Sequence, residues 1–350
     1  MKTIFIVDDN DTNLMAAKTA LDGSYKTFAV PSAEKMFKLA EKITPDLILL
    51  DVDMPVMDGF EAMRILKSDT ALKSIPVVFL TAKHDAESEV RGFEMGALDF
   101  VNKPFSQPVL IKRIEMHIET DKLIKESQAA VREIHNATIS VIADMVENRD
   151  KVTGGHIERT QLYLEILVNE LLNTGIYEKE MVSWDLSLLL PSAQLHDVGK
   201  IAISDVILNK PGKLTDEEFL EIQHHCAYGE HIIDQIILKT KDDSFLHHAK
   251  MFAGYHHEKW NGKGYPRGLD GENIPLQGRI MAIADVYDAL VCERPYKKPF
   301  THEKAVEIIT NDSGTHFDPK IIEVFVNIAA EFNGPLVKTL ISTNTERLNA

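Results

Sequence analysis

Residues 256–266, HHEKWNGKGYP, place two adjacent imidazoles before a glycine-rich turn. Imidazole is the commonest metal-binding side chain, but successive side chains diverge around a helix axis. His256 and His257 can therefore both bind metal only at a helix end or by bracketing two ions. An isolated His-His pair is more often a pair of surface residues, so the interpretation depends on what accompanies it.

Further potential ligands lie between His135 and His316, a part of the chain that holds 12 of the 14 histidines. They are His156, His196, Asp197, His225 and Asp285. Both aspartates belong to apolar helical runs, where a carboxylate is costly unless it is paired or bound to metal. Metal ions would satisfy both carboxylates. Mixed nitrogen and oxygen ligands suit Fe, Mn, Zn, Ni or Co and do not select among them.

A second set of polar residues lies in the first third of the chain, each after a strand-like apolar run. These residues are Asp8 and Asp9 after 3–7, Asp51 after 46–50, Thr81 after 76–80, and Lys103 after the short run at Phe100-Val101. Amphipathic segments separate the runs, which predicts a doubly wound α/β fold with a five-stranded parallel sheet. Ligands of such sheets bind at the carboxyl ends of the strands. Converging carboxylates there suit Mg²⁺, and a lysine beside them can pair with a phosphoryl group.

Residues 1–120 resemble the receiver domain of bacterial response regulators. The matching residues are Asp8-Asp9, DVDMPVMDG (51–59), Thr81-Ala82 and Lys103-Pro104-Phe105. The resemblance implies a flavodoxin-like fold, with Asp51 as the phosphoacceptor and a sensor histidine kinase as partner. It also implies that Mg²⁺ is held by Asp8 (through water), Asp9, Asp51 and the carbonyl of Asp53. Lys103 would pair with the phosphoryl group, and Thr81 with Phe100 would form the switch that responds to it.

Residues 107–148 contain no glycine and, after Pro108, no proline, so one long connecting helix is predicted. Ile124, Val131, Thr138 and Met145 recur at heptad spacing, with Ile134 and Val141 interleaved. This pattern is typical of a coiled-coil seam, which predicts a dimerisation helix and a homodimer. An amphipathic helix packed on its own domain is an equally compatible interpretation.

The rest of the chain is predicted to be an all-α bundle. Its amphipathic runs are 157–172, 183–195, 216–238, 275–292, 302–311 and 319–332, divided by turn-forming clusters. Residues 135–335 resemble the HD-GYP family of metal-dependent phosphodiesterases, a subgroup of the HD-type hydrolases. The motifs that carry this resemblance are HDVGK (196–200), HHEKWNGKGYP, GRIMAIADVYDAL (278–290), RPYK (294–297) and GTHFDP (314–319).

This second resemblance implies a phosphorylation-regulated enzyme that cleaves cyclic di-GMP to linear pGpG and, in some members, to GMP. The family's metal ligands carry over to His156, His196, Asp197, His225, His256, His257 and Asp285. Asp197 and Lys200 would be catalytic, and substrate contacts would come from Lys200, Tyr265, Pro266, Arg294 and Lys297. Asp288, one helical turn after Asp285, is expected to orient a ligand. The other histidines of this part are expected to be surface or supporting groups.

Val152 departs from the family pattern. Many members carry a metal-binding glutamate four residues before the first histidine, and an aliphatic side chain there cannot bind metal. We therefore expect two divalent transition-metal ions and not three. The departure keeps two alternatives open: a low-turnover cyclic di-GMP sensor or effector, and an HD hydrolase that prefers pGpG or another nucleotide.

Length and composition limit the number of domains, the kinds of partner and the location that the chain can have. At 350 residues the chain exceeds the size at which one core stops growing, so two domains are expected. A net charge of −16 argues against broad binding to nucleic acid or anionic membranes. Two cysteines and the lack of a signal-like or transmembrane segment favour a cytoplasmic protein. Residues 338–350 are expected to be a polar tail.

Overall fold

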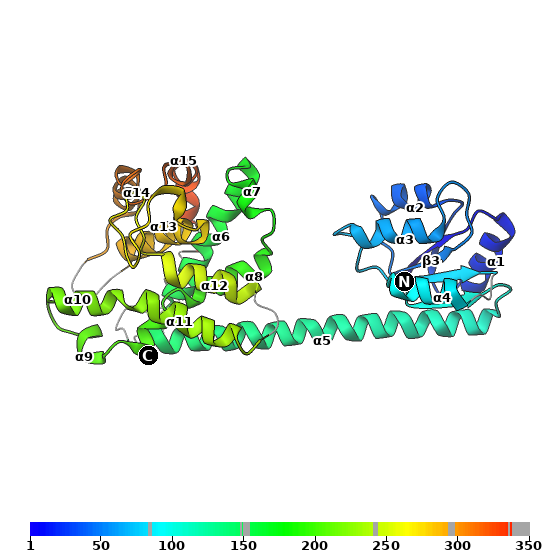
Figure 1. The fold of residues 1–350 in the computed structure, drawn as a ribbon. Helices are drawn as coiled ribbons and strands as arrows, with labels where there is room; N and C mark the ends of the chain where they lie inside the picture. Colours follow the sequence, from blue (N-terminus) through cyan, green and yellow to red (C-terminus); the bar gives the residue numbers. More distant parts are fainter. Residues whose placement is uncertain are drawn as a thin grey trace. The chain divides into compact units, whose positions relative to one another are not determined.

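The computed structural model of this chain describes residues 1–82, 86–147, 149, 155–240, 244–292, 298–334 and 337. They form two compact units, Met1–Arg132 and Glu133–Ala350 (Figure 1). Arg294, Lys297, Val152 and the predicted polar tail lie outside the described residues.

The first unit is built on a five-stranded parallel sheet of order β2-β1-β3-β4-β5. The strands are β1 (Thr3–Val7), β2 (Lys26–Val30), β3 (Leu47–Asp51), β4 (Val77–Thr81) and β5 (Asp99–Asn102). The helices between them are α1 (Asp11–Leu21), α2 (Ala33–Ala40), α3 (Gly59–Ser68) and α4 (Ala86–Glu94). The predicted doubly wound α/β fold is confirmed. We predicted no range for β2, an edge strand that lacks a fully buried residue and a continuous apolar run.

The sheet is covered on both faces because side chains alternate along each strand. In β1, Phe5 and Val7 belong to the apolar cluster that α2 and α3 complete. Ile4 and Ile6 belong to the opposite cluster, which α1 and the start of α5 complete. This burial on both faces explains why the central strands read as uninterrupted apolar runs.

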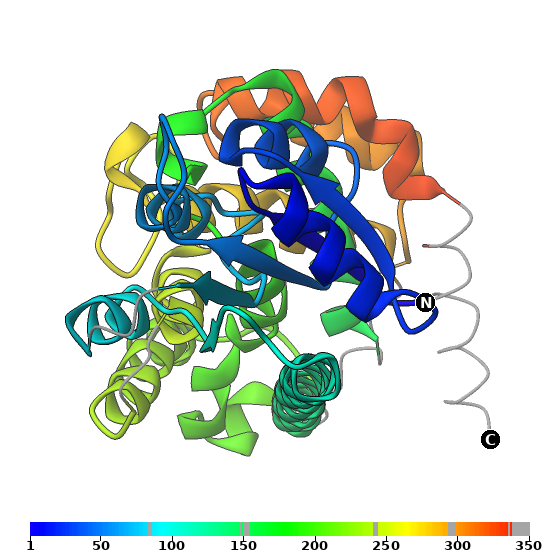
Figure 2. The ribbon, with the colours of Figure 1, turned by 90° about the vertical axis from the view of Figure 1, so that its right-hand side faces the viewer.

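Helix α5 (Gln107–Glu147) has 41 residues and follows β5. Figure 2 views it nearly end-on. Its first turns pack Leu110 and Ile114 on the sheet. The Asp99 carboxylate on β5 accepts hydrogen bonds from Arg113 Nη1 at 2.6 Å and His117 Nε2 at 3.0 Å. Although burial opposes it, these two bonds lower the pKa of Asp99 below its usual value. The start of α5 is therefore joined to β5 by both apolar packing and charge.

The second unit contains no strand among its described residues and confirms the predicted all-α fold. Its α-helices are α6 (His156–Thr174), α7 (Glu178–Met181), α8 (Leu186–Ser192), α9 (Asp205–Leu208), α10 (Asp216–Gln223), α11 (His225–Ile237), α12 (Ser244–Tyr255), α13 (Leu276–Val291), α14 (His302–Asn311) and α15 (Pro319–Ile328). Short 3₁₀ helices are η1 (Ala193–Leu195), η2 (Val198–Ala202), η3 (Gly271–Asn273) and η4 (Ala329–Asn333). Nowhere in the described parts of the chain is a helix both long and apolar enough to cross a membrane.

Two features of this unit differ from the sequence-based expectation. The run predicted at 216–238 is two helices, because the amide of His224 bonds to the carbonyl of Glu221 and tightens the chain before α11 begins. We did not predict α12, whose segment SFLHHAKMFAGY interrupts its apolar residues with two histidines, a lysine and a glycine. Helix α12 leads directly to His256.

Asp99→Asn is expected to lower the free energy of unfolding of the first unit by about 1–2 kcal/mol, because the charged acceptor of two hydrogen bonds is lost. Denaturant unfolding of the full chain, followed by a probe in the first unit, measures the change. Glu119→Gln removes an exposed carboxylate from the same helix and serves as the control. Equal stability of the two variants would contradict the role assigned to Asp99.

Candidate metal centre

The first unit brings three predicted carboxylates together at the carboxyl ends of β1 and β3. Asp8, Asp9 and Asp51 each offer an oxygen within 4.8 Å of the others. Lys103 Nζ lies 2.7 Å from Asp51 Oδ1 and 2.5 Å from Asp8 Oδ2. Burial raises the pKa of Asp51, and the hydrogen bond and charge of Lys103 partly offset that effect. The arrangement suits Mg²⁺ next to a carboxylate that accepts a phosphoryl group.

The predicted switch residues lie on β4 and β5, the two strands that follow β3 in the sheet. Thr81 is buried at the end of β4. Phe100 is also buried, with ring centroids 5.1 Å from Phe79 and 5.2 Å from Phe93. Asp53 is exposed and lies outside the carboxylate cluster. The predicted role of Asp53 uses its backbone carbonyl, so that role and the switch both stay predictions.

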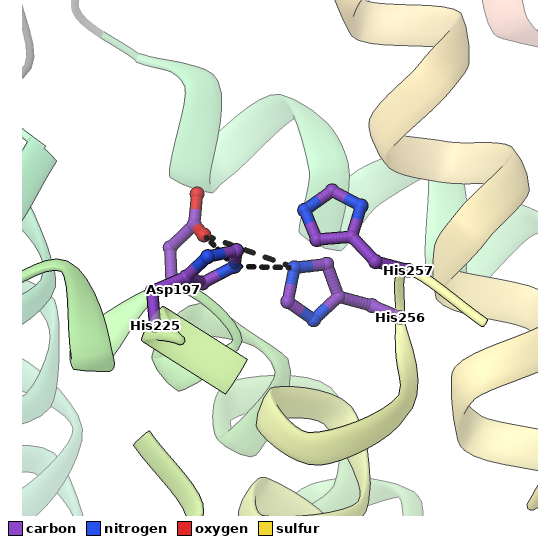
Figure 3. Close-up of side chains that lie close together, drawn as sticks. All are labelled: Asp197, His225, His256 and His257. Atoms are coloured by element: carbon purple, nitrogen blue, oxygen red, sulfur yellow. Dashed lines mark hydrogen bonds and ion pairs between the residues drawn. The ribbon is translucent and has the colours of Figure 1, made fainter. Parts of the chain in front are cut away.

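In the second unit, four predicted ligands form one cluster (Figure 3). One ligand atom each from Asp197, His225, His256 and His257 lies within 4.8 Å of the other three. Asp197 Oδ1 is 3.4 Å from His225 Nε2 and 3.8 Å from His256 Nε2. His256 and His257 follow the last turn of α12, so the adjacent pair does sit at a helix end. Both histidines face the same cluster.

Backbone carbonyls orient three of the imidazoles. The Nδ1 atoms of His196, His225 and His256 lie 2.9, 2.7 and 2.9 Å from the carbonyls of Ala193, Ile222 and Phe252. A carbonyl only accepts, so each Nδ1 carries a proton, and Nε2 is the atom through which the neutral form of each ring can bind metal. Burial lowers the pKa of His256 to about 3, which keeps that ring neutral. Neutral rings with free Nε2 atoms are the form that binds metal.

A second cluster consists of His156, His196 and Asp285, again with ligand atoms within 4.8 Å of one another. His156 Nδ1 lies 2.8 Å from Asp288 Oδ2, and Arg159 Nε donates to Asp288 Oδ1 at 2.7 Å. His156 Nε2 faces Asp285 Oδ1 at 3.6 Å. Asp288 therefore holds the His156 ring from the side away from the cluster, which is the geometry of a residue that orients a ligand.

The two clusters fit divalent transition-metal ions. His196 Nε2 and Asp197 Oδ1 are buried and have no hydrogen-bond partner. Buried polar atoms without partners are costly, and a metal ion would satisfy both. Although burial opposes it, the charges of Lys200 and His196 hold the pKa of Asp197 well below its usual range, so it is an anion ready to bind. The donor set is mixed imidazole and carboxylate, as in mononuclear and dinuclear sites of Fe, Mn or Zn.

Both clusters border one cavity of about 440 Å³. Predicted residues in its wall are His156, Asp197, Lys200, His225, His257, Tyr265 and Asp285. Lys200 Nζ lies 2.7 Å from Asp197 Oδ2, and the ring of Tyr265 stacks at an angle on His257 with centroids 4.8 Å apart. Pro266 is exposed and does not line this cavity.

Sequence reasoning missed two charged residues in the cavity wall, Glu147 and Lys210. Glu147 ends the long helix α5, and the buried neighbours Ala143 and Val146 could have indicated that this turn faces the protein interior. Lys210 precedes Pro211-Gly212 in a segment whose only sequence signal is that of a turn.

Gly199 sets the distance between the segment that carries Asp197 and helix α11. A Cβ atom on Gly199 would lie 1.9 Å from the carbonyl oxygen of His225 and 2.4 Å from the amide nitrogen of Gly229. The two backbones therefore touch only because residue 199 lacks a side chain. At Gly229, four residues after His225, an added Cβ would lie 3.2 Å from Ala253 Cβ and 3.3 Å from the amide nitrogen of Gly199, so this position is also tightly packed.

Gly199→Ala is expected to push η2 away from α11, separating Asp197 from His225 and lowering the free energy of unfolding by roughly 1–3 kcal/mol. The measurement is the thermal unfolding midpoint with and without added Mn²⁺, and the metal-induced rise should be largely lost. Gly254→Ala on α12 is the control, because its new methyl group would lie 3.4 Å from the flexible Glu230 side chain. An unchanged Mn²⁺ effect in Gly199→Ala would contradict this role.

Comparisons with known proteins agree with this two-part organisation. The family model for the response regulator receiver domain matches residues 4–115, and that for the HD domain matches residues 115–321. A probable cyclic di-GMP phosphodiesterase of Vibrio cholerae is 38% identical over 339 residues, which cover 93% of this chain and 77% of that protein. The cyclic di-GMP phosphodiesterase response regulator RpfG of Xanthomonas campestris is 33% identical, covering 82% of this chain and 76% of that protein.

A 3'3'-cGAMP-specific phosphodiesterase 2 of Vibrio cholerae is 40% identical over 202 residues, 58% of this chain and 36% of that protein. The receiver domain at the start of the chain and the HD domain after it are both matched, and relatives with curated names match most of the chain's length. The chain belongs to the response regulators that join a receiver domain to an HD domain, the family that includes these cyclic di-GMP phosphodiesterases.

Proposed function

We propose that this protein is a phosphorylation-regulated phosphodiesterase that uses two divalent transition-metal ions to hydrolyse cyclic di-GMP to pGpG, with GMP as a further product. The observation that carries the proposal is a pair of His/Asp clusters bordering one cavity, each with ligand atoms within 4.8 Å of one another. The relatives named as cyclic di-GMP phosphodiesterases support this substrate class.

Ions at the two clusters would activate a water molecule and neutralise charge that develops on phosphoryl oxygens. Asp197 carries the carboxylate closest to His225 and His256, and its pairing with Lys200 fixes its direction. Lys200 and Lys210 supply positive charge to the wall of the cavity in an acidic protein, which suits an anionic phosphodiester. Tyr265 provides an aromatic wall for a guanine base. Arg294, Lys297 and Pro266 stay predicted substrate contacts.

Cleavage breaks the bond between phosphorus and one ribose 3′ oxygen. The hydroxyl of water joins phosphorus, and the 3′ oxygen leaves with a proton. The product of the first cleavage is linear pGpG, and the same chemistry on its remaining phosphodiester bond gives GMP.

The receiver site would control this activity through Asp51. Phosphorylation by a sensor histidine kinase in the cytoplasm would add negative charge where Lys103 already pairs with Asp51 and Asp8, next to Mg²⁺ held by Asp8, Asp9, Asp51 and the carbonyl of Asp53. Lys103 would turn to the phosphoryl oxygens. Thr81, buried at the end of β4, and Phe100, buried in the neighbouring strand β5, would respond to that change.

Two alternative functions remain as candidates. The relative specific for 3'3'-cGAMP is 40% identical over 202 residues, which favours testing a mixed cyclic dinucleotide, pGpG and other nucleotides as preferred substrates. A low-turnover cyclic di-GMP sensor or effector would keep the same cavity and bind without hydrolysis.

The metal-loaded protein is expected to convert cyclic di-GMP to pGpG, and chromatography of the products checks this against 3'3'-cGAMP, pGpG and dNTPs. Asp197→Asn should reduce turnover at least about 100-fold, because a metal-binding carboxylate is replaced by a neutral amide. Asp51→Ala should abolish the change in rate that a small phosphodonor causes in the natural chain. No product from any substrate would rule out both enzyme functions.

We also propose that α5 pairs with α5 of a second copy in a parallel homodimer. The predicted seam residues Ile124, Val131, Ile134, Val141 and Met145 are each more than half exposed in the single chain. These five exposed apolar side chains follow one another at intervals of seven, three, seven and four residues, which fit the heptad repeat of a coiled-coil seam.

Sedimentation is expected to give a dimer for the natural chain and a shift towards monomer for Val131→Glu, because a buried carboxylate in the seam would be unpaired. Ala129→Glu adds the same charge at an exposed position off the seam and is the control. A monomer both with and without a phosphate mimic would exclude this dimer.

A further inference from the structure

Glu147, the last residue of α5, reaches the cavity that contains the two metal-ligand clusters. It lines the cavity together with His156 and Asp285. Its neighbours Ala143 and Val146 are each 3% exposed, so this turn of α5 faces the interior. The Oε1 atom of Glu147 is buried and has no hydrogen-bond partner.

A buried carboxylate oxygen without a partner is energetically unfavourable. Burial raises the pKa of Glu147 to about 7, although the nearby charges of His156, Arg159 and His196 oppose that rise. The other buried atoms without a hydrogen-bond partner include His196 Nε2, in the three-ligand cluster, and Asp197 Oδ1, in the four-ligand cluster. Cations at the two clusters would satisfy His196 Nε2 and Asp197 Oδ1, and a carboxylate of Glu147 that reached one of these cations would also gain a partner.

The two clusters are unequal without Glu147. Asp197, His225, His256 and His257 supply four ligand atoms to one position, whereas His156, His196 and Asp285 supply three to the other. Glu147 lines the cavity with His156 and Asp285, which are two of the ligands in the three-ligand cluster. It lies outside the set of atoms within 4.8 Å of one another, and rotation about its side-chain bonds would have to bring it inward.

Arg149 holds the chain beside Glu147 in place. Its guanidinium donates to the carbonyls of Ile201 at 2.7 Å and Ile203 at 3.0 Å, and to Asp205 Oδ1 at 2.8 Å. The carbonyl of Arg149 accepts from Asn209 Nδ2 at 2.8 Å. These bonds fasten the end of α5 to the segment that follows Asp197 and Lys200, so the backbone at Glu147 is fixed relative to a metal ligand.

We propose that Glu147 is a carboxylate ligand for the divalent ion held by His156, His196 and Asp285, and that α5 thereby contributes directly to the metal centre. This inference rests on the proposed two-metal function. It assigns to one chain segment both the apolar seam and a ligand of the site.

The experiment compares the natural chain with Glu147→Gln, which keeps the size and removes the charge, and with Glu147→Asp, which keeps the charge on a shorter side chain. Glu158→Gln is the matched control, because Glu158 lies exposed in the first turn of α6. Each full-length protein is stripped with chelator, loaded with Mn²⁺ and dialysed. Metal content is then measured by elemental analysis, and the thermal midpoint is measured before and after loading.

The natural chain and Glu158→Gln are expected to retain two ions. Glu147→Gln is expected to retain about one, with affinity for the second reduced roughly tenfold or more, and Glu147→Asp should fall between. The metal-free Glu147→Gln protein should unfold at the same temperature as the natural chain or higher, since an unpartnered buried charge is gone. Its metal-induced rise in midpoint should be smaller.

Full retention of both ions by Glu147→Gln at unchanged affinity would overturn the assignment while leaving the proposed function intact. A metal-free midpoint several degrees below that of the natural chain would also overturn it, because it would show a purely structural role. If the natural chain retained no ion, this inference and the proposed function would fail together.

Discussion

The backbone contact between Gly199 and α11 is the constraint on which the helical unit's site depends. Asp197 and Lys200 lie on one side of this contact and His225 on the other, and a Cβ at residue 199 would lie 1.9 Å from the carbonyl oxygen of His225. No side-chain adjustment relieves a clash with backbone, so the spacing of the two segments is set by the absence of an atom. Without that close approach, Asp197 Oδ1 would not lie 3.4 Å from His225 Nε2.

Hydrogen bonds at Nδ1 of each imidazole leave Nε2 as the nitrogen that can bind metal. Nδ1 of His196, His225 and His256 each donates a hydrogen bond to a backbone carbonyl three or four residues earlier, and Nδ1 of His156 donates to the Asp288 carboxylate. The carbonyls fix Nδ1 as a protonated atom of their rings. Asp288 is a charged acceptor: although burial opposes it, its hydrogen bond and charge raise the pKa of His156 to about 9.

Much of this organisation was predictable from the sequence because its signals are local. The central strands are continuous apolar runs, and the polar residues that follow them converge by the geometry of a parallel sheet. HDVGK and the His-His pair indicated the ligands. What was missed depends on tertiary packing: β2 lies at a sheet edge, and the two histidines and glycine of α12 obscure its apolar face. Glu147 belongs to the site only because α5 extends past its apolar seam into the cavity wall.

Among the elements that the structure describes, helix α5 is the one that spans both units. Leu110 and Ile114 near its start pack on the receiver sheet, and Ile139 near its end packs on the apolar cluster of α11 and α12. Hydrogen bonds along a continuous helix resist local unwinding, so a rotation imposed at β5 through Asp99 and Arg113 would carry along the helix. At the other end, Arg149 connects the chain to the segment after Lys200, and Glu147 and His156 line the same cavity. Under the proposed function, a phosphorylation signal carried by α5 would arrive at a segment that lines the cavity of the metal ligands.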